Sequence, residues 1–156
     1  MSQQQLRRLP VRSIMAPKSV LFLWATGPRL HLAIDAIASW GLHFRGVTYV
    51  WVKTNREGRI IAGQGIPPTF TKPTTEFILA ATTIKTGRPF PIQSFNQAQV
   101  VLAPRRSHSE KPEIFHALIE ELCGDIPRIE LFARKEYAGW DLWGDEAPFQ
   151  SVDLHP

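Results

Sequence analysis

The sequence predicts an α/β fold in which helices cover both faces of a mostly parallel sheet. Three observations predict it: apolar runs of strand length recur along the chain, a run of helical periodicity separates the first two, and a second helical run precedes the last strand. Strand, helix and strand within about 35 residues form a βαβ unit, for which a right-handed parallel crossover is expected. The 156 residues, of which 44% are hydrophobic, suit a single domain over residues 1–156 with a real core.

The first strand, the helix and the second strand each have a distinct pattern. The continuous apolar run SVLFLWA at 19–25 is typical of a strand that is buried on both faces. Leu30, Ile34 and Ile37 then recur at helical spacing, which predicts a helix over 29–40 that ends before Gly41. The β-branched and aromatic stretch GVTYVWVK at 46–53 predicts the second strand.

The second half of the chain continues the alternation. Apolar face residues Ile114, Leu118 and Leu122 predict a helix over 111–123, with Pro112 in its first turn, where a missing N–H costs nothing. Three further parallel strands are expected, at 76–83, 98–103 and 128–134. Two long loops are expected at 54–74 and 84–97, and such loops tend to be functional or mobile.

Composition limits the function classes. The net charge of +4 favours a polyanionic partner without demanding one, and no basic-aromatic motif marks a dedicated nucleic-acid-binding module. The lone Cys123 excludes an internal disulfide and a Cys-rich zinc site, and it fits a reducing compartment such as the cytoplasm. The five histidines lack metal-ligand spacing, so no metal is expected. The longest apolar run is too short to span a bilayer, so no membrane is expected either.

Polar residues follow several of the predicted strands. In open α/β sheets ligands bind beyond the carboxyl ends of the strands, which makes Lys53, Asn55 and Arg134 candidates for a site. The alternative for each is a solvated turn. The stretch GQG at 63–65 lacks the strand-turn-helix context of a dinucleotide fingerprint, and the absence of G-x-S-x-G disfavours a hydrolase.

The run SHSEKPEIFHALIEEL at 107–122 places polar groups just ahead of a predicted helix. Ser107 and Ser109 suit helix capping, which accounts for them without a function. Lys111 is different, because a cation in the first turn opposes the helix dipole. A residue placed against its local preference is a modest indication of function.

Seven motifs occur in a fixed order: VLFLWATG, SWG, YVWVKTNREGRI, TEFILAAT, RSHSEKPEIFHALIEEL, IELFAR and GWDLWGDE. Together they resemble the N-6 adenine methyltransferases named for the seventy-kilodalton subunit of the messenger-RNA adenosine methyltransferase, over roughly residues 3 to 147. The resemblance implies a Rossmann-like methyltransferase sheet. It further implies an enzyme that binds S-adenosylmethionine and methylates the exocyclic amine of adenine in DNA or RNA.

The resemblance also implies roles for residues on the cofactor side. Lys111 of SEKPE would meet the carboxylate of the methyl donor. Phe132 and Arg134 of ELFAR would lie along the cofactor, with Arg134 near its ribose. Asp145 and Glu146 of WGDE would reach the ribose and adenine, in the place where many members have Asn-Gln or Asn-Glu.

On the substrate side, the resemblance implies Lys53, Asn55 and Glu76. The family's catalytic signature, Asp-Pro-Pro-Trp, does not occur in the sequence, and Pro67-Pro68 lies in another loop without a preceding Asp. No catalytic residue is therefore assigned. The resemblance predicts that the sheet lacks one central strand, between the LFLWA and IELFAR strands.

Two interpretations follow for this chain, which we expect to be inactive alone. In one it is an N-terminally shortened form of an active methyltransferase. In the other it is a non-catalytic subunit that binds nucleic acid or cofactor and pairs with a complete methyltransferase.

Overall fold

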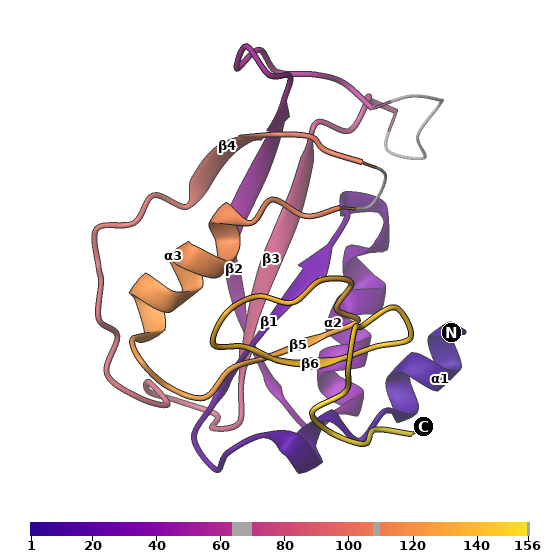
Figure 1. Ribbon diagram of the computed structural model, residues 1–156, viewed down its shortest axis with the longest axis vertical. Helices are drawn as coiled ribbons and strands as arrows, with labels where there is room; N and C mark the ends of the chain where they lie inside the picture. The colour runs from indigo at the N-terminus through magenta and orange to yellow at the C-terminus, as the bar shows by residue number, and fades with distance from the viewer. Residues whose placement is uncertain (64–69, 108–109, 156) are drawn as a thin grey trace.

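The computed structural model describes residues 1–63, 70–107 and 110–155 (Figure 1). Pro67, Pro68, His108 and Ser109 lie outside these ranges. A four-stranded sheet in the order β1-β3-β2-β4 forms the centre, and a separate pair of short parallel strands lies beside it. The strands are β1 (Val20–Ala25), β2 (His43–Thr54), β3 (Thr75–Thr82), β4 (Val100–Pro104), β5 (Ile129–Leu131) and β6 (Asp141–Trp143).

The sheet is mixed, so the prediction of a mostly parallel sheet is wrong. β4 pairs with β2 in parallel, but β3 runs antiparallel to both β1 and β2. A parallel return from β2 to β3 would need a crossover, usually a helix. The described parts of the 55–74 connection contain an isolated bridge between Thr54 and Ile60 but no helix, and the chain reverses direction instead. The α/β class itself is confirmed, as is the Rossmann-like character of the sheet.

Helices lie on opposite faces of the main sheet (Figure 1). α2 (Leu30–Ser39) follows the short 3-10 helix η2 (Gly27–Arg29) and packs on one core cluster with Leu21, Leu23 and Leu79. α3 (Ile114–Cys123) packs on a second cluster on the other face, which includes Phe22 and Trp24. The alternation of β1 residues between the two clusters confirms a strand that is covered on both faces.

The last helix begins later than predicted. α3 starts at Ile114 with Glu113 as its N-cap, so Lys111 lies three residues before the helix and not in its first turn. The interpretation of Lys111 as a cation opposing the helix dipole is therefore wrong. The position of Lys111 follows instead from its contacts with Glu76 and Trp24.

Four elements were not predicted: α1 (Gln3–Arg8), the 3-10 helices η1 (Val11–Ile14) and η2, and β6. α1 has a polar sequence without helical periodicity, and Ser2 and Gln5 stabilise its start through a capping box. β6 and β5 have three residues each, and β5 stops before Phe132, whose φ is 60°. The predicted strand at 128–134 is thus shortened and belongs to the smaller sheet.

Candidate functional site

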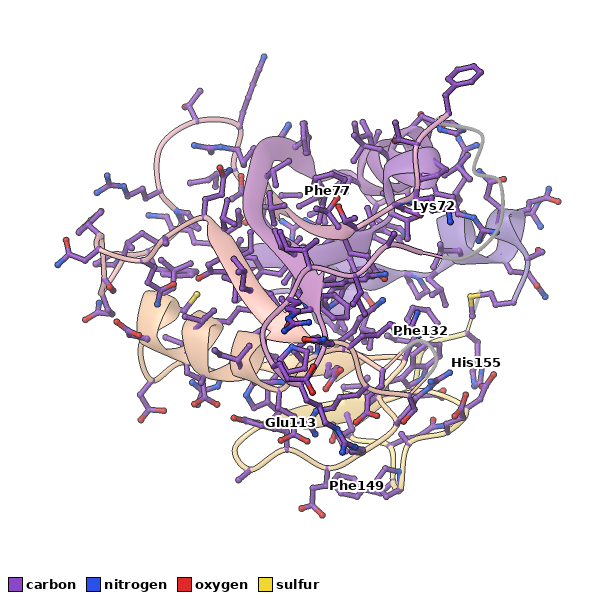
Figure 2. All side chains as sticks on the ribbon, turned by 90° about the horizontal axis from the view of Figure 1, so that it is seen from above. Lys72, Phe77, Glu113, Phe132, Phe149 and His155 are labelled. Atoms are coloured by element: carbon purple, nitrogen blue, oxygen red, sulfur yellow. The ribbon has the colours of Figure 1, made fainter. Side chains whose placement is uncertain are left out.

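Lys53 and Asn55, two of the polar residues expected near carboxyl strand ends, lie at one end of the main sheet. Because β3 runs antiparallel to both β1 and β2, those two strands share a direction, and β4 shares it with β2. Their carboxyl ends therefore meet at the edge where β3 begins. Figure 2 looks onto this end of the molecule. The register pairs Trp51 with Glu76, so Glu76 and Lys53 lie on adjacent strands at this carboxyl edge.

A carboxylate held between two ammonium groups is the main feature of this edge. Glu76 Oε1 is 2.7 Å from Lys53 Nζ, and Lys111 Nζ donates a hydrogen bond to Glu76 Oε2. Side-chain exposure is 10% for Glu76, 20% for Lys53 and 30% for Lys111. We call these three residues the lysine–glutamate cluster. It joins a residue expected on the cofactor side to two expected on the substrate side.

The charge of the lysine–glutamate cluster follows from its environment. Burial acts to raise the pKa of Glu76, but the hydrogen bonds and charges of Lys111 and Lys53 outweigh it, so the pKa lies below its usual value. Glu76 is therefore ionised at neutral pH. Two ammonium groups against one carboxylate leave the cluster with a net charge of +1.

Tryptophan rings fix the two lysines from the side of the core. Lys111 Nζ lies 5.2 Å from the centroid of the Trp24 ring, and Lys53 Nζ lies 5.2 Å from that of Trp51. Both distances are within the range of cation–π attraction. The Trp51 indole donates to the Ala103 carbonyl at 2.8 Å and is buried. The ring beside Lys53 is therefore held in place.

A second group of predicted residues lies where the chain after β5 contacts the chain at the end of β6. An ideal Cβ on Gly144 would lie 2.8 Å from Phe132 Cα, so β6 and the residues after β5 touch backbone to backbone. Phe132 has a left-handed φ of 60° and is 47% exposed as a residue. Its ring packs edge-on against Trp143, with 5.4 Å between the ring centroids. A bulky residue in this region is strained, which is typical of functional sites.

Arg134 and the WGDE segment also meet here. Arg134 Nε lies 3.3 Å from Glu146 Oε2, whereas Asp145 is exposed. We call Phe132, Arg134, Asp145 and Glu146 the C-terminal group.

An ion network that sequence reasoning missed joins the surroundings of the two groups. Lys135 Nζ lies 2.6 Å from Glu110 Oε1 and 3.8 Å from Glu113 Oε1. Hydrogen bonds from Lys135 and Ser107 hold the pKa of Glu110 at about 2. Glu110 precedes Lys111 and Lys135 follows Arg134, so this pair links the neighbourhoods of the predicted cofactor-side residues. Their spacing of 25 positions gave no signal in the sequence.

Asn55 has a local structural role. Its side-chain oxygen accepts from the Arg59 N–H at 2.9 Å, and its carbonyl accepts from the Gly58 N–H at 3.1 Å. This is a turn closed by an Asn side chain. The side-chain oxygen that a substrate could use is thus already engaged.

We expect Glu76→Gln to destabilise the chain, because it leaves Lys53 and Lys111 without their carboxylate. Hydrogen bonds to charged groups contribute roughly 1.5–3 kcal/mol, so the melting temperature should fall by about 3–12 °C. Glu57→Gln, at an exposed loop position, is the matched control and should change little. Thermal unfolding of the three proteins at pH 7 tests this, and equal melting temperatures for the two variants would contradict it.

The stability of the parent and that of Glu76→Gln should depend differently on pH. The folded pKa of Glu76 lies below the unfolded value of about 4.3. Its contribution is therefore present above that value and is lost as the pH falls through the folded pKa. The gap between parent and Glu76→Gln should close in acid, below about pH 4. A gap that is constant from pH 7 to pH 3 would show that the carboxylate charge is not involved.

Neither a metal site nor a membrane span is found in the part of the chain that the structure describes. Residues 1–63, 70–107 and 110–155 hold no group of three or more His, Cys, Asp or Glu placed to bind a metal ion. Within the same ranges, no helix combines the length and apolar character needed to cross a bilayer.

Comparisons with known proteins agree on one family. The MT-A70 family model matches residues 1–146. The type II methyltransferase M.MunI of Mycoplasma sp is 35% identical over 153 residues, which cover 97% of this chain and 60% of that protein. The human N(6)-adenosine-methyltransferase catalytic subunit METTL3 is 34% identical over 137 residues, covering 86% of this chain and 22% of the relative.

A third relative extends the range of similar proteins. The human N(6)-adenine-specific methyltransferase METTL4 is 29% identical over 163 residues, covering 98% of this chain and 34% of the relative. The chain thus spans about three fifths of the length of the bacterial relative and about a third or less of the two human ones.

Proposed function

The chain belongs to the MT-A70 family, and we propose that it is a homologue of S-adenosylmethionine-dependent N-6 adenine methyltransferases that acts on DNA or RNA. Its similarity to proteins named as adenine and adenosine methyltransferases supports this reaction class. The site residues proposed below rest on the geometry of the carboxyl edge.

The net positive charge of the lysine–glutamate cluster is the observation that carries the proposal. An ammonium group has three N–H donors. Lys111 donates to Glu76 through one of them, and its side chain is 30% exposed, so further donors are available to a ligand. A carboxylate approaching Lys111 would meet an uncompensated positive charge that Glu76 and the Trp24 ring hold in position. The carboxylate of S-adenosylmethionine fits this chemistry.

The C-terminal group fits the remainder of the cofactor. The exposed Phe132 ring offers a flat apolar surface to an adenine, and the exposed Asp145 carboxylate can accept from ribose hydroxyls. Arg134 and Glu146 form an exposed pair at the same place. When bound, S-adenosylmethionine supplies the methyl group. The chain's residues would hold its two ends.

Glu76 acts in this proposal as a positioning residue. Both of its oxygens are occupied by ammonium groups, and its lowered pKa makes it a poor proton acceptor. Its task is to hold Lys111 towards the cofactor and Lys53 towards the substrate. Asn55 is placed at the same edge, where its turn orients the loop after β2. Neither lysine can accept a hydrogen bond, so these residues do not replace the Asp and Pro carbonyl acceptors of Asp-Pro-Pro-Trp.

A second candidate function rests on that missing motif. A chain that binds the cofactor or nucleic acid without the acceptor pair would serve as the non-catalytic partner of a complete methyltransferase. For either role we propose that the chain resides in a reducing compartment such as the cytoplasm. The free Cys123 is buried, and burial raises the pKa of its thiol to about 11, which makes it unreactive.

The test of the proposed cofactor site is Lys111→Ala. Charge-assisted hydrogen bonds to a carboxylate contribute roughly 1.5–3 kcal/mol, so the affinity for S-adenosylmethionine should fall at least about tenfold. Lys85→Ala, at the opposite end of β3, is the matched control and should bind as the parent does. Calorimetric titration of the three proteins measures this. Equal affinity of Lys111→Ala and parent would remove Lys111 from the site.

A further inference from the structure

The basic residues of the chain are unevenly distributed along the sequence. Residues 1–75 contain ten Lys or Arg and two Asp or Glu, whereas residues 76–156 contain eight and twelve. Three segments are basic without any acidic residue, namely 1–19, 39–48 and 82–99. A surface on which the fold brought such segments together would attract polyanions.

The fold brings these segments together at the end of the sheet opposite the candidate site. β1 and β2 begin there and β3 ends there. The Ser19 N–H donates to Thr83 Oγ1 at 3.0 Å, which places Lys18 beside the end of β3. Arg45 Nη1 donates to Thr82 Oγ1 at 3.3 Å, and Thr82 in turn bonds the Ile84 carbonyl, directly before Lys85. Three cations thus surround the last residues of β3.

α1 extends this surface. The Trp40 indole donates to the Leu6 carbonyl at 3.0 Å, which fastens α1 to the end of α2 that leads into β2. Figure 1 shows α1 beside this end of α2. A hollow of about 530 Å³ lies between them, lined by Gln3, Gln4, Arg7, Arg8 and Ser39. We call the whole the basal basic surface; it consists of Arg7, Arg8, Arg12, Lys18, Arg45 and Lys85.

The cations of the basal basic surface differ in their partners from the lysines of the candidate site. At the carboxyl edge Lys53, Lys111 and Lys135 each pair with a carboxylate. Among the residues that the structure describes, no carboxylate lies within ion-pair distance of any member of the basal basic surface, and every member is exposed. Unpaired exposed cations keep their charge available for a ligand.

The position of the surface separates it from the candidate methyl-transfer site. β3 has eight residues and rises about 3.3 Å per residue, so roughly 25 Å lie between the two ends. Acidic residues lie near one flank, where Glu121 accepts from Ser94 and Asp125 follows α3. A polyanion held by Lys85 and Lys18 would lie away from that flank.

We infer that the basal basic surface binds phosphates of the nucleic-acid backbone, on the side of the sheet opposite the candidate methyl-transfer site. The inference rests on the proposed nucleic-acid function and adds a second, sequence-independent contact to it. Exposed Lys and Arg without carboxylate partners are the groups that contact phosphates in nucleic-acid complexes. A strand held at both ends of the sheet would wrap around one side of the molecule.

The test is fluorescence anisotropy with a 30-nucleotide oligothymidine, which contains no adenine and so separates backbone binding from methylation. The triple variant Lys18→Gln, Arg45→Gln and Lys85→Gln should bind at least about tenfold more weakly at 0.15 M salt. Its slope of log affinity against log salt should be smaller by about 2. Lys18→Arg, Arg45→Lys and Lys85→Arg keep the charge and should bind as the parent does. Because Arg45 bonds Thr82, a second triple (Arg7→Gln, Arg8→Gln and Arg12→Gln) covers the case of a poorly folded first variant.

Location and ligand class are tested separately. Ultraviolet crosslinking of the same oligonucleotide, followed by peptide mapping, should mark peptides from 1–19 and 82–88. Crosslinks confined to 53–76 and 105–135, or unchanged affinity in both triple variants, would overturn the inference and leave the proposed methyltransferase function standing. Binding to phosphatidylserine vesicles without binding to oligonucleotide would overturn it in favour of a lipid surface. If the parent chain shows no S-adenosylmethionine binding in calorimetry, that result would instead count against the proposed function.

Discussion

The chain alone is expected to transfer no measurable methyl group to adenine in DNA or RNA. The exocyclic amine is a poor nucleophile because its lone pair is delocalised into the ring. Catalysis needs hydrogen-bond acceptors that rehybridise this nitrogen and aim it at the methyl carbon, and such positioning supplies most of an enzyme's rate enhancement. The resemblance assigns that task to Asp-Pro-Pro-Trp, which the sequence lacks.

The geometry of the carboxyl edge offers no replacement among the predicted substrate-side residues. Lys53 is a donor, both oxygens of Glu76 are engaged, and the Asn55 side-chain oxygen closes a turn. Asp145 and Glu146 are exposed carboxylates that directly follow Gly144, the residue in backbone contact with Phe132. They are the residues to suspect if activity is found.

The experiment combines the pure chain with labelled S-adenosylmethionine and adenine-containing DNA or RNA, with and without a full-length relative. Robust transfer by the chain alone would contradict the expectation and would call for Asp145→Ala and Glu146→Ala variants. Transfer that exceeds the activity of the relative alone would favour the partner-subunit interpretation. No added activity in the mixture would count against the partner-subunit interpretation.

Gly144→Ala is expected to have the largest effect on stability. The φ of Gly144 is +155°, and its added Cβ would lie 2.8 Å from Phe132 Cα and 3.0 Å from the Ala133 nitrogen. Because both neighbours are backbone atoms, they cannot turn aside as a side chain would. Overpacking costs about 1–3 kcal/mol, and an unfavourable backbone conformation adds about 1–2 kcal/mol. We expect a loss of roughly 2–5 kcal/mol in the free energy of unfolding, together with weaker S-adenosylmethionine binding.

Gly58→Ala is the matched control for this prediction. Gly58 also has a left-handed φ, of +83°, but among the residues that the structure describes no atom lies within 4 Å of the place that an added Cβ would take. It therefore carries the backbone cost without the collision. Chemical denaturation of both variants and the parent measures the difference, and equal losses for Gly144→Ala and Gly58→Ala would show that the segments do not touch as described.

Hydrophobic pattern was enough to find most of the fold. The apolar run around Leu23 and the helical spacing of Leu30, Ile34 and Ile37 gave β1 and α2 close to their observed bounds. The direction of β3 could not be found this way, because a period-two pattern is the same in a parallel and an antiparallel strand. The connection before β3 does carry a signal, because it has no helical pattern and a parallel crossover usually needs a helix.

The candidate site shows the same limit at the level of side chains. Lys53, Glu76 and Lys111 were each singled out, but assigned to two different ligands. Glu76 and Lys111 are 35 positions apart, and no sequence pattern shows that one carboxylate holds both lysines. The sequence predicts that Lys111 opposes a helix dipole, and the structure shows that it lies outside the helix. Long-range pairing of charges is decided by strand order and register, which the sequence leaves open.

Amide chemical-shift mapping of the 17.7 kDa chain during titration with S-adenosylmethionine tests the proposed site most directly. We expect shifts at Lys111, Phe132, Arg134, Asp145 and Glu146, with smaller ones at Lys53 and Glu76 and none at Lys18 or Lys85. Such a map would show that the lysine–glutamate cluster and the C-terminal group hold one cofactor. Shifts confined to residues outside these two groups, or no shifts at saturating cofactor, would contradict it.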